Sequence, residues 1–468
     1  MASYIYKTKP YRYQHEAVRR ALKQGYIGLL FEPGCGKSKV IVDWVSCLSI
    51  KEGPQRVLII CPLSVVGVWE DEFADHCPVP YSYDTLGPKD ESLARHRNPK
   101  QVQVLVINYD LAWRRKALLA RFDATVVVAD ESHRIKRPST KRSWYLRSHN
   151  RVPHRAILTG TPTPRSFLDI YGQWVFLNRK RFGTNFAEFK RNYIRYGGYM
   201  NRQVQGYLNV KELKQKIDAD AIIQDKSPLD LPPRMYQRVP VVLEPEAWKA
   251  YQKMAYELFL ELKNGDVSDA ANVVVKILRL QQITGGWIKS DEGNIHQISE
   301  VKIKSAQERL EDEWNGNERV VTFARFRPEV QALTDFGLRS GVPTYMLAGG
   351  VRRQDRDDMR RRFQAEDGPS VFIAQIQTGG LGITLHKAAE VLFYSVTHSL
   401  DDYIQACDRV HRIGQDRPVR YQHLVGVKTI DIDIYAALRQ KKRIQDIVMM
   451  NPKKFAAKLA KDLDLGFD

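Results

Sequence analysis

Short runs of apolar and β-branched residues recur along this chain, and longer stretches with helical character separate them. Near-continuous apolar strands are typical of parallel sheets, because helices cover both faces of such a sheet. The pattern stops near the middle of the chain and then restarts, so the sequence predicts an α/β protein with two parallel-sheet lobes. The predicted strands are residues 27–30, 56–61, 102–108, 125–129 and 155–159, followed by 320–323, 344–347, 371–374, 391–394 and 421–425.

The break between the predicted lobes falls at residues 227–233, where SPLDLPP supplies three prolines and no regular periodicity. Residues 246–282 favour a helical element that leads into the second lobe. A chain of 468 residues is long enough for two or three domains, each with its own core. We expect an N-terminal lobe at 1–231, a linker and helical element at 232–300, and a C-terminal lobe at 301–468.

The chain carries 73 Lys and Arg against 54 Asp and Glu, a formal charge of +19. This excess favours a polyanion such as nucleic acid, although acidic membranes and acidic proteins would also be attracted. No apolar run approaches the ~20 residues that span a bilayer, and the first residues lack the charged-then-apolar order of a secretion signal. We expect a cytoplasmic protein, neither secreted nor embedded in a membrane, and the compact organisation favours a bacterial, archaeal or viral context.

The segment FEPGCGKS, residues 31–38, follows a predicted strand and opens a predicted helix. In that context backbone N–H groups and a helix N-terminus cradle phosphates, with Lys37 on the β- and γ-phosphates and Ser38 on Mg²⁺. The match is to the looser P-G-x-G-K-S form, and this segment alone also fits an ordinary turn. The cradle would consist of Pro33, Gly34, Cys35 and Gly36.

The segment VVVADESH, residues 126–133, ends an apolar strand in two carboxylates. Acids at the carboxyl end of a parallel strand lie where ligands bind in such sheets. We expect Asp130 to hold Mg²⁺ near Ser38, and Glu131 to orient the attacking water. A solvated acid pair is the alternative. The five scattered cysteines form no C-x-x-C pair, so metal is expected only as Mg²⁺ that accompanies ATP.

Near the C-terminus, QACDRVHRIGQ spans residues 405–415. If residues 403–412 are helical, Gln405, Arg409 and Arg412 share one face. Two guanidiniums on one face form either a solvated basic stripe or a phosphate clamp. In a second lobe, Arg409 and Arg412 would stabilise transition-state charge on a nucleotide held by the first lobe.

With these segments in place, the chain resembles the Swi/Snf-type DNA-translocase family of helicase superfamily two from about residue 11 to residue 431. The resemblance implies two RecA-like lobes with an ATP site in the cleft between them. The similar segments are YRYQ at 11–14, VLIICPLSVVGVWEDEF at 57–73, DESHRIK at 130–136, LTGTP at 158–162, VTFARF at 321–326, TGGLGITL at 378–385 and DRVHRIGQ at 408–415. Two departures from the family are Ser132, where alanine is usual and a neutral effect is expected, and Thr384, where asparagine is usual.

The resemblance also implies roles for individual residues, among them recognition of the adenine by Gln14. The implied nucleotide contacts are Arg12, Gln14, Pro33, Gly34, Cys35, Gly36, Lys37, Ser38, Gly382 and Gln405. The implied nucleic-acid contacts are Pro62, Ser64, Asn108, Thr161, Arg325, Thr378 and Gly379. Basic clusters at residues 134–142 and 352–362 would line the DNA track or form solvated helix faces. Trp69, Trp113, Trp144 and Trp174 are expected to pack in a core or at the surface rather than to stack on bases.

These features predict an enzyme, a DNA-stimulated ATP hydrolase that moves along double-stranded DNA without separating its strands. No extra hairpin or wedge-like aromatic residue that would separate strands is expected. Three alternatives stay open. They are a strand-separating DNA or RNA helicase, a motor subunit that works with other protein subunits in a repair or defence complex, and a DNA-binding scaffold without enzymatic activity.

Overall fold

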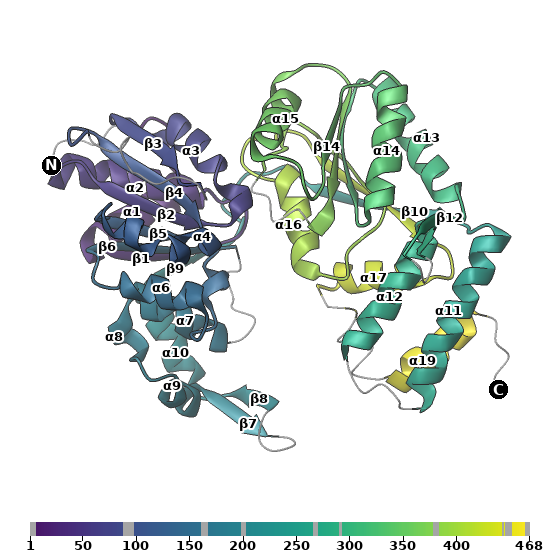
Figure 1. Cartoon of the computed structure of the whole chain (residues 1–468), viewed down its shortest axis with the longest axis horizontal. Helices are drawn as coiled ribbons and strands as arrows, with labels where there is room; N and C mark the ends of the chain where they lie inside the picture. The colour runs from purple at the N-terminus through teal and green to yellow at the C-terminus, as the bar shows by residue number, and fades with distance from the viewer. Residues whose placement is uncertain are drawn as a thin grey trace. The chain divides into compact units, whose positions relative to one another are not determined.

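The computed structural model describes residues 6–87, 98–160, 167–197, 203–264, 270–289, 293–377, 383–441, 444 and 452–463. The chain divides into two compact units, Met1–Asp230 (unit 1) and Leu231–Asp468 (unit 2) (Figure 1). Each unit is built around one parallel sheet, as the alternation of apolar strands and helices predicts.

The sheet of unit 1 has seven strands, and every neighbouring pair runs parallel. Its central strands are apolar along their length because both faces are covered; Leu58 and Ile59, which point to opposite faces, are both 0% exposed. In sheet order the strands are β3 (Tyr81–Thr85), β4 (Val102–Asn108), β2 (Arg56–Cys61), β5 (Val126–Ala129), β6 (His154–Thr159), β1 (Tyr26–Phe31) and β9 (Ala221–Gln224).

Helices cover both faces of this sheet (Figure 1). Leu58, Ile60 and Leu105 belong to a core shared with α4, α6 and α7, while α1 and α3 pack on α2. The helices of unit 1 are α1 (Arg12–Gln24), α2 (Lys37–Glu52), α3 (Val68–His76), α4 (Tyr109–Arg114), α5 (Lys116–Ala120), α6 (Lys141–Ser148), α7 (Leu168–Leu177), α8 (Arg179–Phe182), α9 (Phe186–Tyr193) and α10 (Val210–Asp218).

An antiparallel hairpin, β7 (Ile194–Gly197) and β8 (Gln203–Tyr207), lies between α9 and α10. The sequence pattern did not predict this hairpin, and the absence of a strand-separating hairpin stays a prediction. A register shift between Arg195 and Tyr196 interrupts the alternation of side chains along β7, so the sequence has no regular two-residue period there.

The sheet of unit 2 has six parallel strands, of which β10 lies at one edge. The segment predicted as a linker from residue 232 therefore supplies a strand, and this part of the prediction is corrected. Only an edge strand tolerates the proline that β10 contains at Pro240. In sheet order the strands are β10 (Arg234–Val241), β17 (Val419–Gly426), β16 (Glu390–Phe393), β13 (Arg319–Ala324), β15 (Ser370–Gln375) and β14 (Thr344–Leu347).

Two separate cores lie on the two faces of this sheet. One joins the sheet to α13 and α14, and the other joins it to α11, α12, α15, α16, α17 and the C-terminal α19. A small hairpin, β11 (Trp287–Lys289) and β12 (Ile295–Gln297), follows α12. The helices of unit 2 are α11 (Pro245–Asn264), α12 (Ala270–Thr284), α13 (Val301–Asn315), α14 (Arg327–Arg339), α15 (Arg353–Ala365), α16 (Leu400–Val410), α17 (Ile430–Arg439) and α19 (Pro452–Asp462).

Candidate functional site

The sheet order of unit 1 brings most of its predicted site residues to one edge. Strands β2, β5, β6 and β1 are neighbours, and their carboxyl ends lead to Pro62, Asp130, Gly160 and the loop at residues 32–36. Since carboxyl ends of parallel strands meet at the same edge, these four segments converge there. Thr161, predicted from the segment after β6, lies outside the described residues.

The glycine loop after β1 has the geometry of a phosphate cradle. Gly34 and Gly36 have φ angles of 87° and 72°, a left-handed conformation that favours glycine. Helix α2 begins directly after them at Lys37, so its free N–H groups face the loop. The Lys37 ammonium donates to the Phe31 carbonyl at 3.0 Å, a contact that a phosphate oxygen would replace.

Two side chains of helix α1 form hydrogen bonds with this loop. The Gln14 amide and the Tyr13 hydroxyl both donate to the Cys35 carbonyl, at 3.2 and 2.9 Å. The Gln14 carbonyl oxygen accepts from the Tyr11 N–H, and the side chain is 0% exposed. Both ends of the amide thus close α1 onto the loop, and the contact between Gln14 and adenine stays a prediction.

A pocket of about 700 Å³ opens beside the start of α1 and includes the predicted residue Arg12 in its wall. The rings of Tyr11 and Tyr13, which also line it, stack with centroids 5.8 Å apart. Aromatic faces and a guanidinium are groups that bind a planar base. This pocket is a place next to the loop that a base could occupy.

Asp130 is 7% exposed and is held by two aromatic residues whose contacts with it were not predicted from the sequence. The Trp69 indole donates to Asp130 Oδ2 at 3.2 Å, and the Tyr109 hydroxyl donates to the Asp130 carbonyl at 2.7 Å. Burial, and then the Glu131 charge, raise the pKa of Asp130 to about 6, while the Lys37 charge opposes that rise. The interaction with Lys37 shows that the loop and the acidic strand end are neighbours.

Glu131 begins the short 3₁₀ turn Ser132–Ile135 with a φ of 49°, a conformation that non-glycine residues rarely adopt. Its carboxylate lies 3.2 Å from His133 Nδ1. Behind the turn, the Ser132 hydroxyl donates to Gln173 Oε1 of α7 at 2.5 Å. The turn is thus fixed from the α7 side, and the serine that departs from the family pattern has a partner there.

The chemistry of this edge fits Mg²⁺ bound together with a nucleotide. Mg²⁺ in such sites is held by one or two protein oxygens plus phosphate oxygens, and Ser38 and Asp130 provide that number. Among the described residues, no cluster of three or more His, Cys, Asp or Glu could hold a metal ion alone. Within the same described part, no helix is both long enough and apolar enough to span a membrane.

The predicted nucleic-acid contacts of unit 1 lie at the ends of β2 and β4. Pro62 is buried at the end of β2, and nothing is described for the side chain of Ser64. The Asn108 carbonyl oxygen accepts from the N–H groups of Asp110 and Leu111, at 3.1 and 3.0 Å. Asn108 is therefore the N-cap of α4, and that structural role explains its place at the end of β4.

In unit 2, α16 ends at Val410 rather than at the predicted residue 412. Gln405 and Arg409 are one helical turn apart, as predicted, but Arg412 lies in the following turn. The prediction that all three share one helix face is corrected. The helix ends because His411 leaves the helical conformation, with φ and ψ of −91° and 85°.

The other polar residues of DRVHRIGQ fasten this turn to the sheet. Arg234 of β10 donates to Asp408 Oδ1 and to His411 Nδ1, both at 2.9 Å. Burial opposes the charge on Arg234, but the Asp408 carboxylate raises its pKa above the usual range. The Gln415 amide donates to the Ala388 carbonyl at 2.8 Å. Arg234 lay in the predicted linker, so the sequence offered no signal for this contact.

Arg325, predicted as a nucleic-acid contact, is 2% exposed, and its Nη1 donates to Thr397 Oγ1 at 2.7 Å. Burial lowers the pKa of Arg325 to about 10. A direct phosphate contact by this guanidinium is incompatible with that burial, so the prediction is corrected. Thr378, Gly379 and Gly382 lie outside the described residues.

A model of the SNF2-related domain matches residues 13–285, which is more than half of the chain. The chain belongs to the SNF2-related family. A second model, the helicase conserved C-terminal domain, matches residues 301–414 and so includes Arg409 and Arg412. The family resemblance stated from the sequence motifs is confirmed.

Similar proteins come from several kingdoms. The putative ATP-dependent helicase/translocase YwqA of Bacillus subtilis is 24% identical over 92% of this SNF2-related chain and 47% of its own length. The probable ATP-dependent DNA helicase CHR23 of Arabidopsis thaliana is 26% identical over 89% and 41%. This chain therefore spans less than half the length of these relatives. The Sulfolobus solfataricus SWI2/SNF2 ATPase core in complex with dsDNA is 23% identical, with coverage of 100% and 99% and a TM-score of 0.43.

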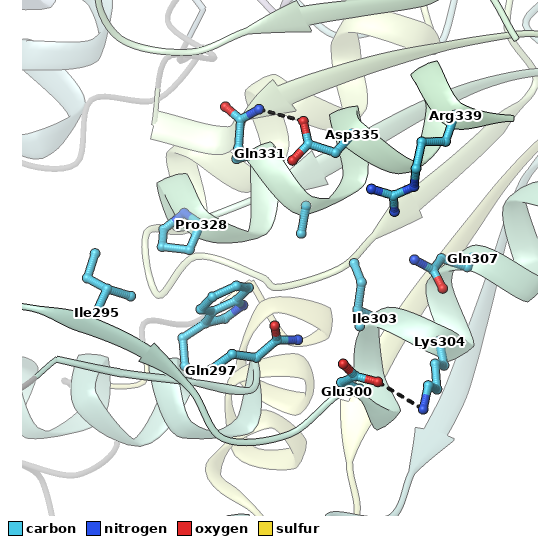
Figure 2. A pocket seen from close by; sticks show the side chains of 12 residues that line it. Ile295, Gln297, Glu300, Ile303, Lys304, Gln307, Pro328, Gln331, Asp335 and Arg339 are labelled. Atoms are coloured by element: carbon cyan, nitrogen blue, oxygen red, sulfur yellow. Dashed lines mark hydrogen bonds and ion pairs between the residues drawn. The ribbon is translucent and has the colours of Figure 1, made fainter. Parts of the chain in front are cut away.

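A second pocket, of about 510 Å³, lies in unit 2 between the β11–β12 hairpin, α13 and α14 (Figure 2). None of the residues predicted from the SNF2-related motifs lines it. Glu300 and Lys304 pair with each other in its wall at 2.9 Å, and Gln331 donates to Asp335 (Figure 2). These polar groups already satisfy one another, so the pocket is separate from the candidate site.

Proposed function

We propose that this chain is a DNA-dependent ATPase that moves along double-stranded DNA without separating its strands. The observation that carries the proposal is the meeting of the Lys37 loop and the buried Asp130 at one sheet edge. A glycine loop at a helix N-terminus beside a carboxylate is suited to a Mg²⁺-bound nucleoside triphosphate. Membership of the SNF2-related family, and relatives named as ATP-dependent helicases, support the same activity.

Each unit would contribute different groups to hydrolysis. In unit 1 the loop N–H groups and Lys37 would hold the phosphates, Ser38 and Asp130 would hold Mg²⁺, and Glu131 would orient the attacking water. Mg²⁺ would neutralise phosphate charge. Arg409 and Arg412 of unit 2 would stabilise the charge that develops on the transferred phosphoryl group. Turnover then requires both units, so ATP hydrolysis can be coupled to movement.

The DNA contacts would be made mainly to phosphates, because the chain carries a formal charge of +19 and movement along DNA must not depend on sequence. Salt should therefore weaken binding steeply. Other protein subunits are compatible with this activity, since the relatives are much longer than this chain.

The testing experiment is steady-state ATP hydrolysis with no nucleic acid, duplex DNA, single-stranded DNA or RNA, using Glu131→Gln as the blank. Strongest stimulation by duplex DNA is expected. Stimulation mainly by single strands or RNA would instead indicate a strand-separating helicase. A lack of stimulation by all three would contradict the proposal for the isolated chain and point to a required partner subunit.

Two substitutions separate the roles of the units. Lys37→Ala should lower turnover by about a hundredfold or more and leave salt-sensitive DNA binding intact.

Arg412→Ala should reduce kcat far more than it weakens ATP binding. The matched control is Arg417→Ala, which removes a nearby exposed arginine whose guanidinium pairs with Glu318. An equal loss from Arg412→Ala and Arg417→Ala would contradict the phosphate role.

A further inference from the structure

Helices α4, α5 and α6 of unit 1 carry two tryptophans set among cations. The Lys141 ammonium of α6 lies 4.7 Å from the ring centroid of Trp113 on α4. The Lys116 ammonium of α5 lies 5.5 Å from the ring centroid of Trp144 on α6. Each lysine thus comes from a different helix than the ring beside it. These residues, together with Arg114, form what we call the α4–α6 surface.

The chain around this surface is strongly basic. Residues 109–121 and 134–147 contain ten Lys and Arg and a single acid, Asp110. The Asp110 carboxylate is bound by Arg142 at 2.6 Å, and Lys136 is paired with Asp169 of α7. Most of the remaining positive charge has no acidic residue within these segments to balance it. A polyanion is the ligand that such a surface favours.

Trp144 differs from the tryptophans in the cores. Its exposed fraction is 57%, whereas Trp69 and Trp174 are each 1% exposed. Trp144 therefore lies at the surface, where solvent reaches more than half of the residue. An exposed indole interleaved with lysines provides a flat surface for a ring and cations for the groups next to it.

We propose that the α4–α6 surface binds single-stranded nucleic acid, with an unpaired base stacked on Trp144 and phosphates held by Lys116, Lys141 and Arg114. Bases in a duplex already stack on one another, so only an unpaired base gains from the indole. The proposal goes beyond the motor activity, which relies on phosphate contacts to duplex DNA. Helix α4 starts at the end of β4, so the bound strand lies on the unit that carries Lys37.

The test measures equilibrium binding of the full chain, without ATP, to a labelled oligothymidylate of about 15 nucleotides and to a duplex of the same length. Trp144→Ala should weaken single-strand binding about tenfold, leave duplex binding unchanged and leave the salt dependence unchanged. Trp144→Phe should restore most of the affinity. Lys116→Gln should weaken single-strand binding and lower the salt slope by about one. Tyr256→Ala, which removes an exposed aromatic ring of unit 2, is the matched control.

Three outcomes would overturn the proposal. They are unchanged single-strand affinity in Trp144→Ala, an equal loss of single-strand and duplex affinity, and displacement of the oligonucleotide by poly-glutamate at matched charge, which would assign the surface to an acidic protein. Thermal melting checks that each variant is folded, and an exposed ring should be removable without loss of stability. Because no ATP is present, failure of the ATPase proposal would leave this measurement unaffected.

Discussion

Units 1 and 2 contain the same kind of parallel sheet, but they use the residues beyond their strand ends differently. In unit 1, the Lys37 ammonium donates to the Phe31 carbonyl at the end of β1, and Asp130 lies near it. A ligand can replace such contacts. In unit 2, Arg325, Glu329 and Asp431 follow the ends of β13 and β17 and are at most 3% exposed. Arg325 Nη1 donates to Thr397, Glu329 accepts from the Ser395 hydroxyl, and Asp431 pairs with Lys302, all within the same unit.

This difference shows that a residue within a family motif need not touch a ligand. Arg325 lies in VTFARF, yet it ties the end of β13 to Thr397. Asp408 and His411 lie in DRVHRIGQ, yet they bind Arg234. We infer that motif residues of unit 2 mainly stabilise the fold, whereas those of unit 1 mainly serve the nucleotide. Substitutions in the two units should then separate loss of stability from loss of activity.

The largest effect is expected from Lys302→Met in unit 2. Lys302 and Asp431 form an ion pair at 2.8 Å with side chains 2% and 4% exposed, and Asp431 also accepts from the Thr284 hydroxyl and the Gly426 N–H. Removal of Lys302 would leave a buried carboxylate without its counter-charge, which should lower the free energy of unfolding of unit 2 by about 3–5 kcal/mol. Urea denaturation measures this change.

The matched control is Lys304→Met on the same helix, whose partner Glu300 is exposed, and it should have little effect. If the two variants unfold at the same urea concentration, the buried residues of unit 2 do not have the stabilising role that the comparison assigns to them.

The next effect is a pH dependence that depends on Glu329. Burial raises its pKa to about 7, although the Ser395 hydroxyl and the Phe326 N–H donate to it and Lys302 lies nearby. Because this is above the ordinary value of 4.5, the native state favours the protonated form. The contribution of protonated Glu329 to the free energy of unfolding is fully present below pH 4.5. This contribution, up to about 3 kcal/mol, is lost as the pH rises through 7.

Glu329→Gln should remove this loss, so the urea midpoints of the variant at pH 5 and pH 8 should differ less than those of the unsubstituted chain. Glu366→Gln, which alters an exposed carboxyl group whose pKa is lowered, is the control. An unchanged pH dependence in Glu329→Gln would show that this carboxyl group is ionised throughout.

The central strands were predictable from the sequence because their burial on both faces leaves a continuous apolar run. The strands β3, β9 and β10 were not predicted. Each lies at a sheet edge, and edge strands mix polar with apolar residues, as the half-buried YSYDT of β3 does. The end of α16 was misplaced because nothing in residues 403–412 stops a helix; the contacts of His411 with Arg234 and the Pro232 carbonyl do.

The candidate site was partly predictable for a related reason. Lys37 and Asp130 belong to short sequence motifs. Their roles could be predicted because the strand or helix next to each motif could be predicted too. Trp69 and Tyr109 contact Asp130 from sequence separations of 61 and 21 residues. Contacts between residues so far apart in the chain cannot be predicted from a single sequence. The structure was therefore needed to identify the groups that orient Asp130.

The smallest expected effect is the loss of stability in Ser132→Ala. Ser132 lies in unit 1 but has a stabilising role, so this substitution tests whether unit 1 also contains such residues. Its hydroxyl is buried and donates to Gln173 Oε1, and Gln173 in turn donates to the Asp169 carbonyl at 2.8 Å. An added Cβ at Gly172 would lie 2.2 Å from the Ile135 carbonyl, so α7 already touches the turn and Gln173 has little room to withdraw. Ser132→Ala should therefore leave a buried acceptor unsatisfied and lower the free energy of unfolding by about 1–2 kcal/mol.

Ser139→Ala, an exposed serine in the same loop, is the control for Ser132→Ala. The double variant Ser132→Ala with Gln173→Leu should recover part of the loss, because removal of both polar partners leaves no unsatisfied group. If Ser132→Ala retains ATP turnover, the Ser132 hydroxyl stabilises the turn but is not needed for the catalytic role of Glu131. If Ser132→Ala is as stable as the unsubstituted chain, the substitution is as neutral as the sequence comparison predicts, and the Ser132 hydroxyl does not stabilise the turn.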